Sequence, residues 1–140
     1  MTTISHIAFE VPRRYRIEEI LFWNALGFYQ QHSHAHPNKN WLSDSSNTFI
    51  HLLPSNTTTL HTPNTHIAMV PRYGVDATLD NLARLPFTVT AEVAAKHWGS
   101  RRIFITSPSG FHLELLDFCP PSRHSGPPTD DLTHQHTDPT

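Results

Sequence analysis

The sequence predicts an α+β fold made of two strand–helix–strand–strand–strand modules in tandem. The prediction rests on three pairs of similar segments that lie about 60 residues apart along the chain. The pairs are Ser5–Ala8 with Thr65–Ala68, Leu26–Phe28 with Leu85–Phe87, and Ile50–Leu53 with Leu113–Leu116. We therefore expect two copies of one unit, at residues 3–54 and 64–118, packed as a single domain over residues 1–118.

The first unit has the periodicities of one strand, one helix and three further strands. A strand is expected over Ile4–Val11, where apolar residues alternate with polar ones before a proline. A helix is expected over Glu18–Leu26, whose apolar residues recur at helical spacing until Gly27 ends it. The three short strands are expected over Phe28–Ser33, Trp41–Asp44 and Thr48–Leu53.

The second unit repeats this order after a polar linker over Pro54–Pro63. The expected elements are a strand at His66–Val70, a helix at Ala77–Leu85, and strands at Phe87–Glu92, Arg102–Thr106 and Phe111–Phe118. Cys119–Thr140 holds five prolines and no aromatic residue. This composition predicts a flexible tail rich in Pro, His and Thr over residues 119–140.

The charge balance and the single cysteine exclude several classes of protein. The chain has 10 Lys and Arg against 12 Asp and Glu, so no basic excess indicates a nucleic-acid partner. Its apolar runs are too short for a membrane span. One cysteine, Cys119, excludes an internal disulfide framework and fits a reducing compartment. We therefore expect a cytoplasmic protein with a small-molecule partner, no nucleic acid and no membrane.

Four ionisable residues occupy equivalent places in the two units. His6 and His66 share a position in the first strand, and His51 and Glu114 share one in the last strand. If a pseudo-twofold axis relates the units, these four side chains can converge on one point. Three imidazoles and one carboxylate suit a divalent transition metal: Fe, Mn, Ni, Co or Zn. The alternative is four separate core or surface residues that find other partners.

Longer segments around these residues carry a family resemblance. They read SHIAFEV at Ser5–Val11, ILFWNALGF at Ile20–Phe28, THIAMV at Thr65–Val70 and RIFITSPSGFHLELLDF at Arg102–Phe118, with Trp41-Leu42 ahead of FIHLL. Together they resemble the vicinal-oxygen-chelate superfamily, which includes glyoxalases, extradiol dioxygenases, fosfomycin-resistance transferases and bleomycin-binding proteins. The resemblance implies a mixed sheet curled around a metal cavity, the glyoxalase-like fold. It also implies metal ligands at His6, His66 and Glu114, a fourth at His51 in some branches, and a homodimer.

The same resemblance implies the activity, with differences from individual branches. Phe104 stands where ring-cleaving dioxygenases usually have tyrosine, and Ala8 stands near a threonine position of the transferases. We expect a metal-dependent enzyme that binds two adjacent oxygens of a small substrate. In a lyase or isomerase, Glu114 or a nearby group would move a proton. In a dioxygenase, His97 or His112 would act as acid or base. The alternative function is a binding or resistance protein that sequesters a small molecule with an empty or structural metal site.

Two arginines lie in one of the last expected strands. Arg101 and Arg102 are consecutive in an expected strand, so their side chains point to opposite faces. A solvated position is the favoured interpretation for both. The alternative is that one of them contacts an anionic substrate.

Overall fold

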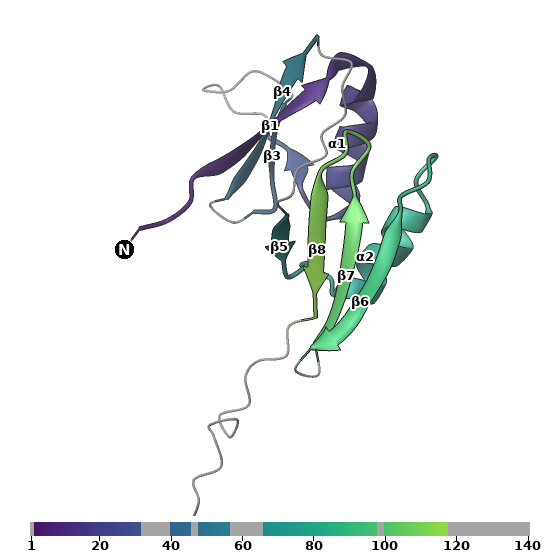
Figure 1. Ribbon diagram of the computed structural model, residues 1–140. Helices are drawn as coiled ribbons and strands as arrows, with labels where there is room; N and C mark the ends of the chain where they lie inside the picture. The colour runs from purple at the N-terminus through teal and green to yellow at the C-terminus, as the bar shows by residue number, and fades with distance from the viewer. Residues whose placement is uncertain (1, 32–39, 46–47, 57–65, 98–99, 118–140) are drawn as a thin grey trace, which may run out of the picture.

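Two four-stranded mixed sheets, each accompanied by one helix, make up the protein (Figure 1). A computed structural model describes residues 2–31, 40–45, 48–56, 66–97 and 100–117. The predicted tail and most of the predicted linker lie outside these residues. The α+β class and the tandem modules are confirmed, with the difference that the two sheets do not close into one curled surface.

The strand order is the same in both sheets. The first sheet has the order β1-β4-β3-β2 and the second has β5-β8-β7-β6. The strands of the first sheet are β1 (His6–Pro12), β2 (Tyr29–Gln30), β3 (Trp41–Ser43) and β4 (Phe49–Ser55). Those of the second are β5 (Ile67–Met69), β6 (Ala91–His97), β7 (Ser100–Thr106) and β8 (His112–Leu116). In each sheet the first strand runs parallel to the last, and the remaining neighbours are antiparallel.

The two helices begin and end close to the predicted places. After a short 3-10 turn, η1 (Arg13–Tyr15), α1 (Arg16–Ala25) buries one face, and α2 (Val75–Ala83) follows Gly74 in the second module. Gly27, just beyond α1, has a φ of 98°, a left-handed conformation that favours glycine and ends the helix. Neither helix of the described segments has the length and apolar character needed to span a membrane.

One predicted strand is wrong in its position. The sequence indicated a strand over Phe87–Glu92, whereas the strand is β6, which begins at Ala91. The alternating apolar residues Phe87 and Val89 pack against the core from an irregular segment instead. An alternating apolar pattern shows that every second side chain is buried. An irregular connecting segment can bury its side chains in this way without pairing to another strand.

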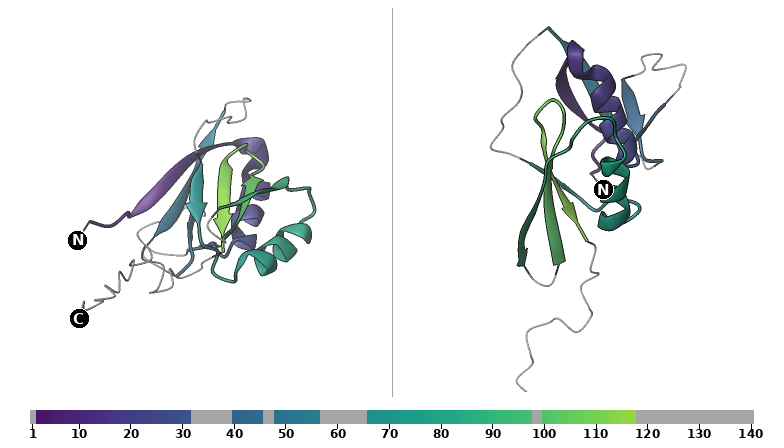
Figure 2. Two further views of the ribbon diagram at one scale, coloured as in Figure 1. Left: turned by 60° about the horizontal axis from the view of Figure 1, so that its bottom comes forward. Right: turned by 90° about the vertical axis from the view of Figure 1, so that its right-hand side faces the viewer.

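Both modules contribute to one hydrophobic core. Phe9 of β1 and Phe111, just before β8, are in ring contact with centroids 4.4 Å apart. Helix α1 contacts α2 (Figure 2). The buried apolar residues are Val11, Ile20, Phe22, Trp23, Leu26, Leu42, Ile50, Leu52, Val75, Leu82, Ile103, Ile105, Phe111, Leu113 and Leu115. Burial of this shared surface is the main force that holds the two modules together.

A buried carboxylate adds a polar link between the modules. Glu19 of α1 is fully buried and accepts a hydrogen bond from Trp23 Nε1 at 3.0 Å. Its other oxygen accepts one from the backbone N–H of Ser109, in the turn between β7 and β8, at 2.6 Å. Desolvation by burial raises the pKa of Glu19, and hydrogen bonds from Ser107, Ser109 and Trp23 oppose this rise. The carboxyl group therefore ties the first helix to the last turn of the second module.

The raised pKa of Glu19 predicts a specific pH dependence of stability. The folded protein holds the Glu19 proton more tightly than the unfolded chain does. Protonated Glu19 therefore contributes fully to the free energy of unfolding at a pH below 4.5, its ordinary pKa. This contribution is lost as the pH rises through the higher pKa of Glu19 in the folded state. We expect Glu19→Gln to remove this decrease when urea unfolding is followed from about pH 4 to pH 7. Glu18→Gln, the adjacent residue of the same helix, should keep the wild-type slope. Identical slopes for wild type and Glu19→Gln would contradict the assignment.

Candidate metal centre

The predicted ligands lie on the open face of each sheet, opposite the face that packs on the core. In the parallel pairing of each module, Ala8 lies beside His51 and Ala68 lies beside Glu114. His6 and His66 are each two residues before these alanines, on the same face. The register therefore makes His6 and His51 the structural equivalents of His66 and Glu114, as the sequence repeat predicted.

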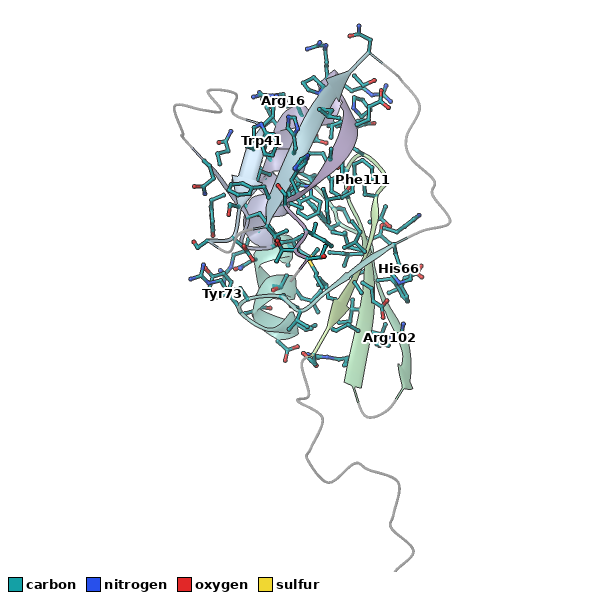
Figure 3. All side chains as sticks on the ribbon, turned by 90° about the vertical axis from the view of Figure 1, so that its left-hand side faces the viewer. Arg16, Trp41, His66, Tyr73, Arg102 and Phe111 are labelled. Carbon is teal, nitrogen blue, oxygen red and sulfur yellow. The ribbon has the colours of Figure 1, made fainter. Side chains whose placement is uncertain are left out.

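In the second module, the predicted ligands His66 and Glu114 are in direct contact. His66 Nε2 lies 2.7 Å from Glu114 Oε2, while Arg102 Nε donates a short hydrogen bond to Glu114 Oε1. The Glu114 side chain is only 3% exposed, against 43% for His66 and 33% for Arg102. Each carboxylate oxygen thus has its own nitrogen partner, and both partners reach the solvent (Figure 3).

These contacts favour the ionised form of Glu114. The hydrogen bond from Arg102 is the largest effect and lowers the pKa of Glu114, against the opposing effect of desolvation. The charge of Arg102 and the contact with His66 lower it further. Glu114 is therefore a carboxylate at neutral pH, which is the form that binds a metal ion.

In the first module, His6 and His51 both contact the indole ring of Trp41. The ring of His51 stacks on Trp41 with centroids 4.0 Å apart and planes 12° apart, and His6 meets Trp41 edge-on at 5.1 Å. The His6 and His51 centroids are 6.5 Å apart. A cavity of about 280 Å³ lies beside them, lined by Ser5, His6, Trp41 and Phe49. Its walls are suited to a flat apolar group.

Within one chain, the two pairs of predicted ligands do not form one cluster. Over the described segments, no group of three or more His, Cys, Asp and Glu side chains is placed to hold a metal ion. Figure 3 shows His66 and Arg102 on the second sheet and Trp41 on the first, at separate places on the molecule. A single chain thus presents two half-sites, each with two candidate ligands.

The donor atoms of the second half-site, His66 and Glu114, are spaced to fit a divalent metal ion. Two neighbouring ligands, each about 2.1 Å from a metal and at a right angle, stand about 3 Å apart. The 2.7 Å between His66 Nε2 and Glu114 Oε2 is close to this separation. Arg102 contacts Oε1, and Oε2 is contacted by His66, so a metal ion would bind between His66 Nε2 and Oε2 in place of their direct contact. The imidazole and carboxylate donors also match the preferences of Fe, Mn, Co, Ni and Zn.

The two further histidines predicted as acid or base have different outcomes. His112 is half-buried on β8, two residues before Glu114 on the same face, and its Nδ1 lies 3.3 Å from Thr106 Oγ1. His97 is the last residue of β6, and its side chain lies outside the described part of the structure. The role of each in catalysis stays a prediction.

A larger cavity lies away from all of these residues. Its volume is about 590 Å³, and it lies between α2 and the segment that leads into β6. The lining residues are Leu79, Leu82, Ala83, Leu85, Pro86, Phe87, Thr88, Val89 and Ala91. None of them ionises, so this cavity supplies no ligand and no acid or base.

Sequence reasoning did not identify two contacts of the site. It favoured a solvated position for Arg102, whereas Arg102 binds Glu114. It also did not predict that Trp41 stacks on His51. Strand alternation could have placed Arg102 and Phe104 on the face of Glu114. The pairing of β7 with β8, which puts Phe104 opposite Glu114, was needed to bring Arg102 within reach.

Comparison with known proteins gives a likeness of fold. No family model matches the sequence, and no curated protein matches it. Among solved structures, a glyoxalase family protein from Enterococcus faecalis has a TM-score of 0.59 and 18% identity, over 82% of this chain and 97% of that one. A member of the glyoxalase/bleomycin resistance protein/dioxygenase superfamily from Sphaerobacter thermophilus has a TM-score of 0.56 and 17% identity, over 84% of this chain and 98% of that one.

A third solved structure with this fold is described as an oxidase. Oxidase ChaP-H1 has a TM-score of 0.61 and 13% identity, over 85% of this chain and 98% of that one. The three structures span nearly their whole length in the comparison, so the full tandem arrangement is shared. The chain therefore has the glyoxalase-like fold of these structures, as the sequence resemblance implied.

Proposed function

We propose that the chain is a divalent-metal-dependent enzyme of the glyoxalase/dioxygenase type, with a site completed by a second copy of the chain. The observation that carries the proposal is the pair of equivalent half-sites, His6 with His51 and His66 with Glu114, on the open faces of the sheets. In a homodimer, the first module of one copy faces the second module of its partner. The four donors then meet at one ion, although they form no such group within the described part of one chain.

The proposed reaction uses the metal as a Lewis acid. When bound, a divalent ion supplies two open positions for adjacent oxygens of a small substrate and offsets negative charge that develops on them. Fe, Mn, Ni, Co and Zn all suit the donor set. The chain itself supplies Glu114 as an ionised ligand, held by Arg102.

Acid–base chemistry falls to residues on the same open face. His112 lies two residues before Glu114 on β8 and is the candidate to take or give a proton, with His97 as the second candidate. Trp41, Phe49 and Phe104 form apolar walls that hold a substrate ring and exclude water. A lyase or isomerase needs only the proton transfer, while a dioxygenase also needs an iron or manganese centre that accepts O₂. We place the enzyme in the cytoplasm, because its single cysteine suits a reducing compartment.

Loss of the Glu114 charge should remove the metal. We expect wild-type protein to bind close to one Mn²⁺, Co²⁺ or Zn²⁺ per chain and Glu114→Gln to bind at least about tenfold more weakly, since a neutral amide is a poor ligand. Metal content after dialysis and calorimetric titration measure this difference. Glu92→Gln is the matched control, because Glu92 lies in the same row of the sheet, across Phe104 from Glu114, and is exposed.

The stability of both variants separates loss of a ligand from loss of the fold. An ion that binds only the folded state raises the melting temperature of the wild type and of Glu92→Gln, and a chelator reverses the rise. Glu114→Gln should fold and show no such rise. Wild-type protein that holds no metal, yet binds aromatic ligands beside Trp41, would favour the binding or resistance protein instead.

Mixing two inactive variants tests whether the site is shared between chains. His6→Ala damages the first module and Glu114→Gln damages the second. After co-refolding of equal amounts, half of the dimers contain one chain of each kind, and each of these dimers has one intact site out of two. About a quarter of wild-type metal binding and activity should therefore return.

The complementation has a clear control. Each variant refolded alone should stay without metal, and its oligomeric state should match that of the wild type in sedimentation analysis. A mixture that recovers no metal, although heterodimers form, would show that the site is not shared between chains.

A further inference from the structure

Arg102 is the cationic side chain of the candidate metal centre. The pairing of β7 with β8 places Phe104 opposite Glu114 and Arg102 opposite Leu116, so all four side chains share the open face of the second sheet. Arg102 reaches back along this face to donate its Nε–H to Glu114 Oε1. Its side chain keeps one-third of its surface exposed.

Most of the hydrogen-bonding capacity of Arg102 is unused. A guanidinium group has five N–H donors in a planar fork. Among the described residues, the only partner of Arg102 is Glu114, which takes the Nε–H. Glu92 lies on the same face and forms no ion pair with Arg102 within the described segments. Within the described residues nothing accepts a hydrogen bond from the two terminal amino groups, so an acceptor brought from solution can bind there.

The neighbouring arginine shows what a purely structural role looks like in this strand. Arg101 points to the other face, where its Nη1 lies 2.8 Å from Asp76 Oδ1 and its Nε lies 3.0 Å from Asp117 Oδ2. Two carboxylates neutralise it and link α2 to the end of β8. Among the residues that the structure describes, Arg102 by contrast contacts a single carboxylate, and that carboxylate is also a proposed metal ligand.

The charge of the loaded site calls for an anion beside Arg102. This step rests on the proposed function. A divalent ion held by three neutral imidazoles and the Glu114 carboxylate retains one positive charge, and Arg102 adds a second. A substrate that binds the ion through an ionised oxygen offsets one of them. The remaining charge, on a face that the substrate shields from water, is costly unless a second negative group pairs with it.

We propose that Arg102 binds a carboxylate group of the substrate, beside the two oxygens that bind the metal. A carboxylate brings a single negative charge, which matches the single charge left over. It also accepts two parallel hydrogen bonds from a guanidinium fork. A phosphate group brings a larger charge than this site leaves unbalanced. The substrate class is therefore a small enolisable or catecholic acid, and Arg102 determines the specificity for its acid group.

Two matched probes test this assignment on the Zn²⁺-loaded protein. The probes are 3,4-dihydroxybenzoate and 3,4-dihydroxybenzamide, which share the adjacent oxygens and the ring and differ in the charge of one group. We expect calorimetric titration to give at least about tenfold tighter binding of the benzoate, as for hydrogen bonds between charged groups. In Arg102→Gln the two affinities should become nearly equal, and Arg102→Lys should restore part of the preference.

Arg101→Gln is the matched control. It removes an adjacent arginine from the same strand and should lower the melting temperature slightly, because its two ion pairs are lost, while the benzoate keeps its advantage. Zn²⁺ titration of each variant shows in parallel whether Glu114 still binds the metal. The preference between the probes is thus read separately from the metal site.

Four results would overturn the inference. In one outcome the protein binds Zn²⁺, but the loaded protein binds the two probes with equal affinity or binds neither. That outcome would overturn the role of Arg102 and leave the metal site in place. A benzoate preference that survives in Arg102→Gln would assign the acid group to another residue. Inorganic phosphate that displaces the benzoate at lower concentration than acetate does would identify a phosphate site. A wild-type protein that binds no Zn²⁺ would overturn the proposed function, and this inference with it.

Discussion

The parallel pairing of the first and last strand in each module is the constraint on which the site depends. It sets Ala8 beside His51 and Ala68 beside Glu114, so the residue two positions before each alanine lies diagonally across from an ionisable partner. A register shift of one residue would turn these side chains into the core, where their polar atoms would lack partners. The apolar residues that alternate with them, among them Ile50 and Leu113, are buried and hold the register.

The same packing explains why one chain presents two half-sites. The modules join through their buried faces, through the contact of Phe9 with Phe111 and through the bridge from Glu19 to the turn at Ser109. Their open faces are thereby left to meet another surface. In the proposed homodimer, twofold symmetry brings the complementary half-site of a second copy to each of these faces.

The two half-sites share a scaffold and differ in chemistry. The first surrounds its histidines with the indole of Trp41, which suits a flat apolar group. The second places Glu114 between His66 and Arg102, which keeps the carboxylate ionised. The proposed shared site combines the apolar wall of the first half-site with the charged corner of the second, where a metal ion is proposed to bind. Such a site selects both the shape and the charge of a small substrate.

The sequence by itself determined the module repeat, the element order and the equivalence of His6 with His66 and of His51 with Glu114, because periodicity and spacing fix which residues share a face. It did not place β6, since the alternation at Phe87 and Val89 arises from packing of an irregular segment. Only the tertiary structure decided that Arg102 holds Glu114 and that the ligands form two pairs within a chain. These contacts depend on strand register and on the packing of whole modules, which local sequence patterns do not encode.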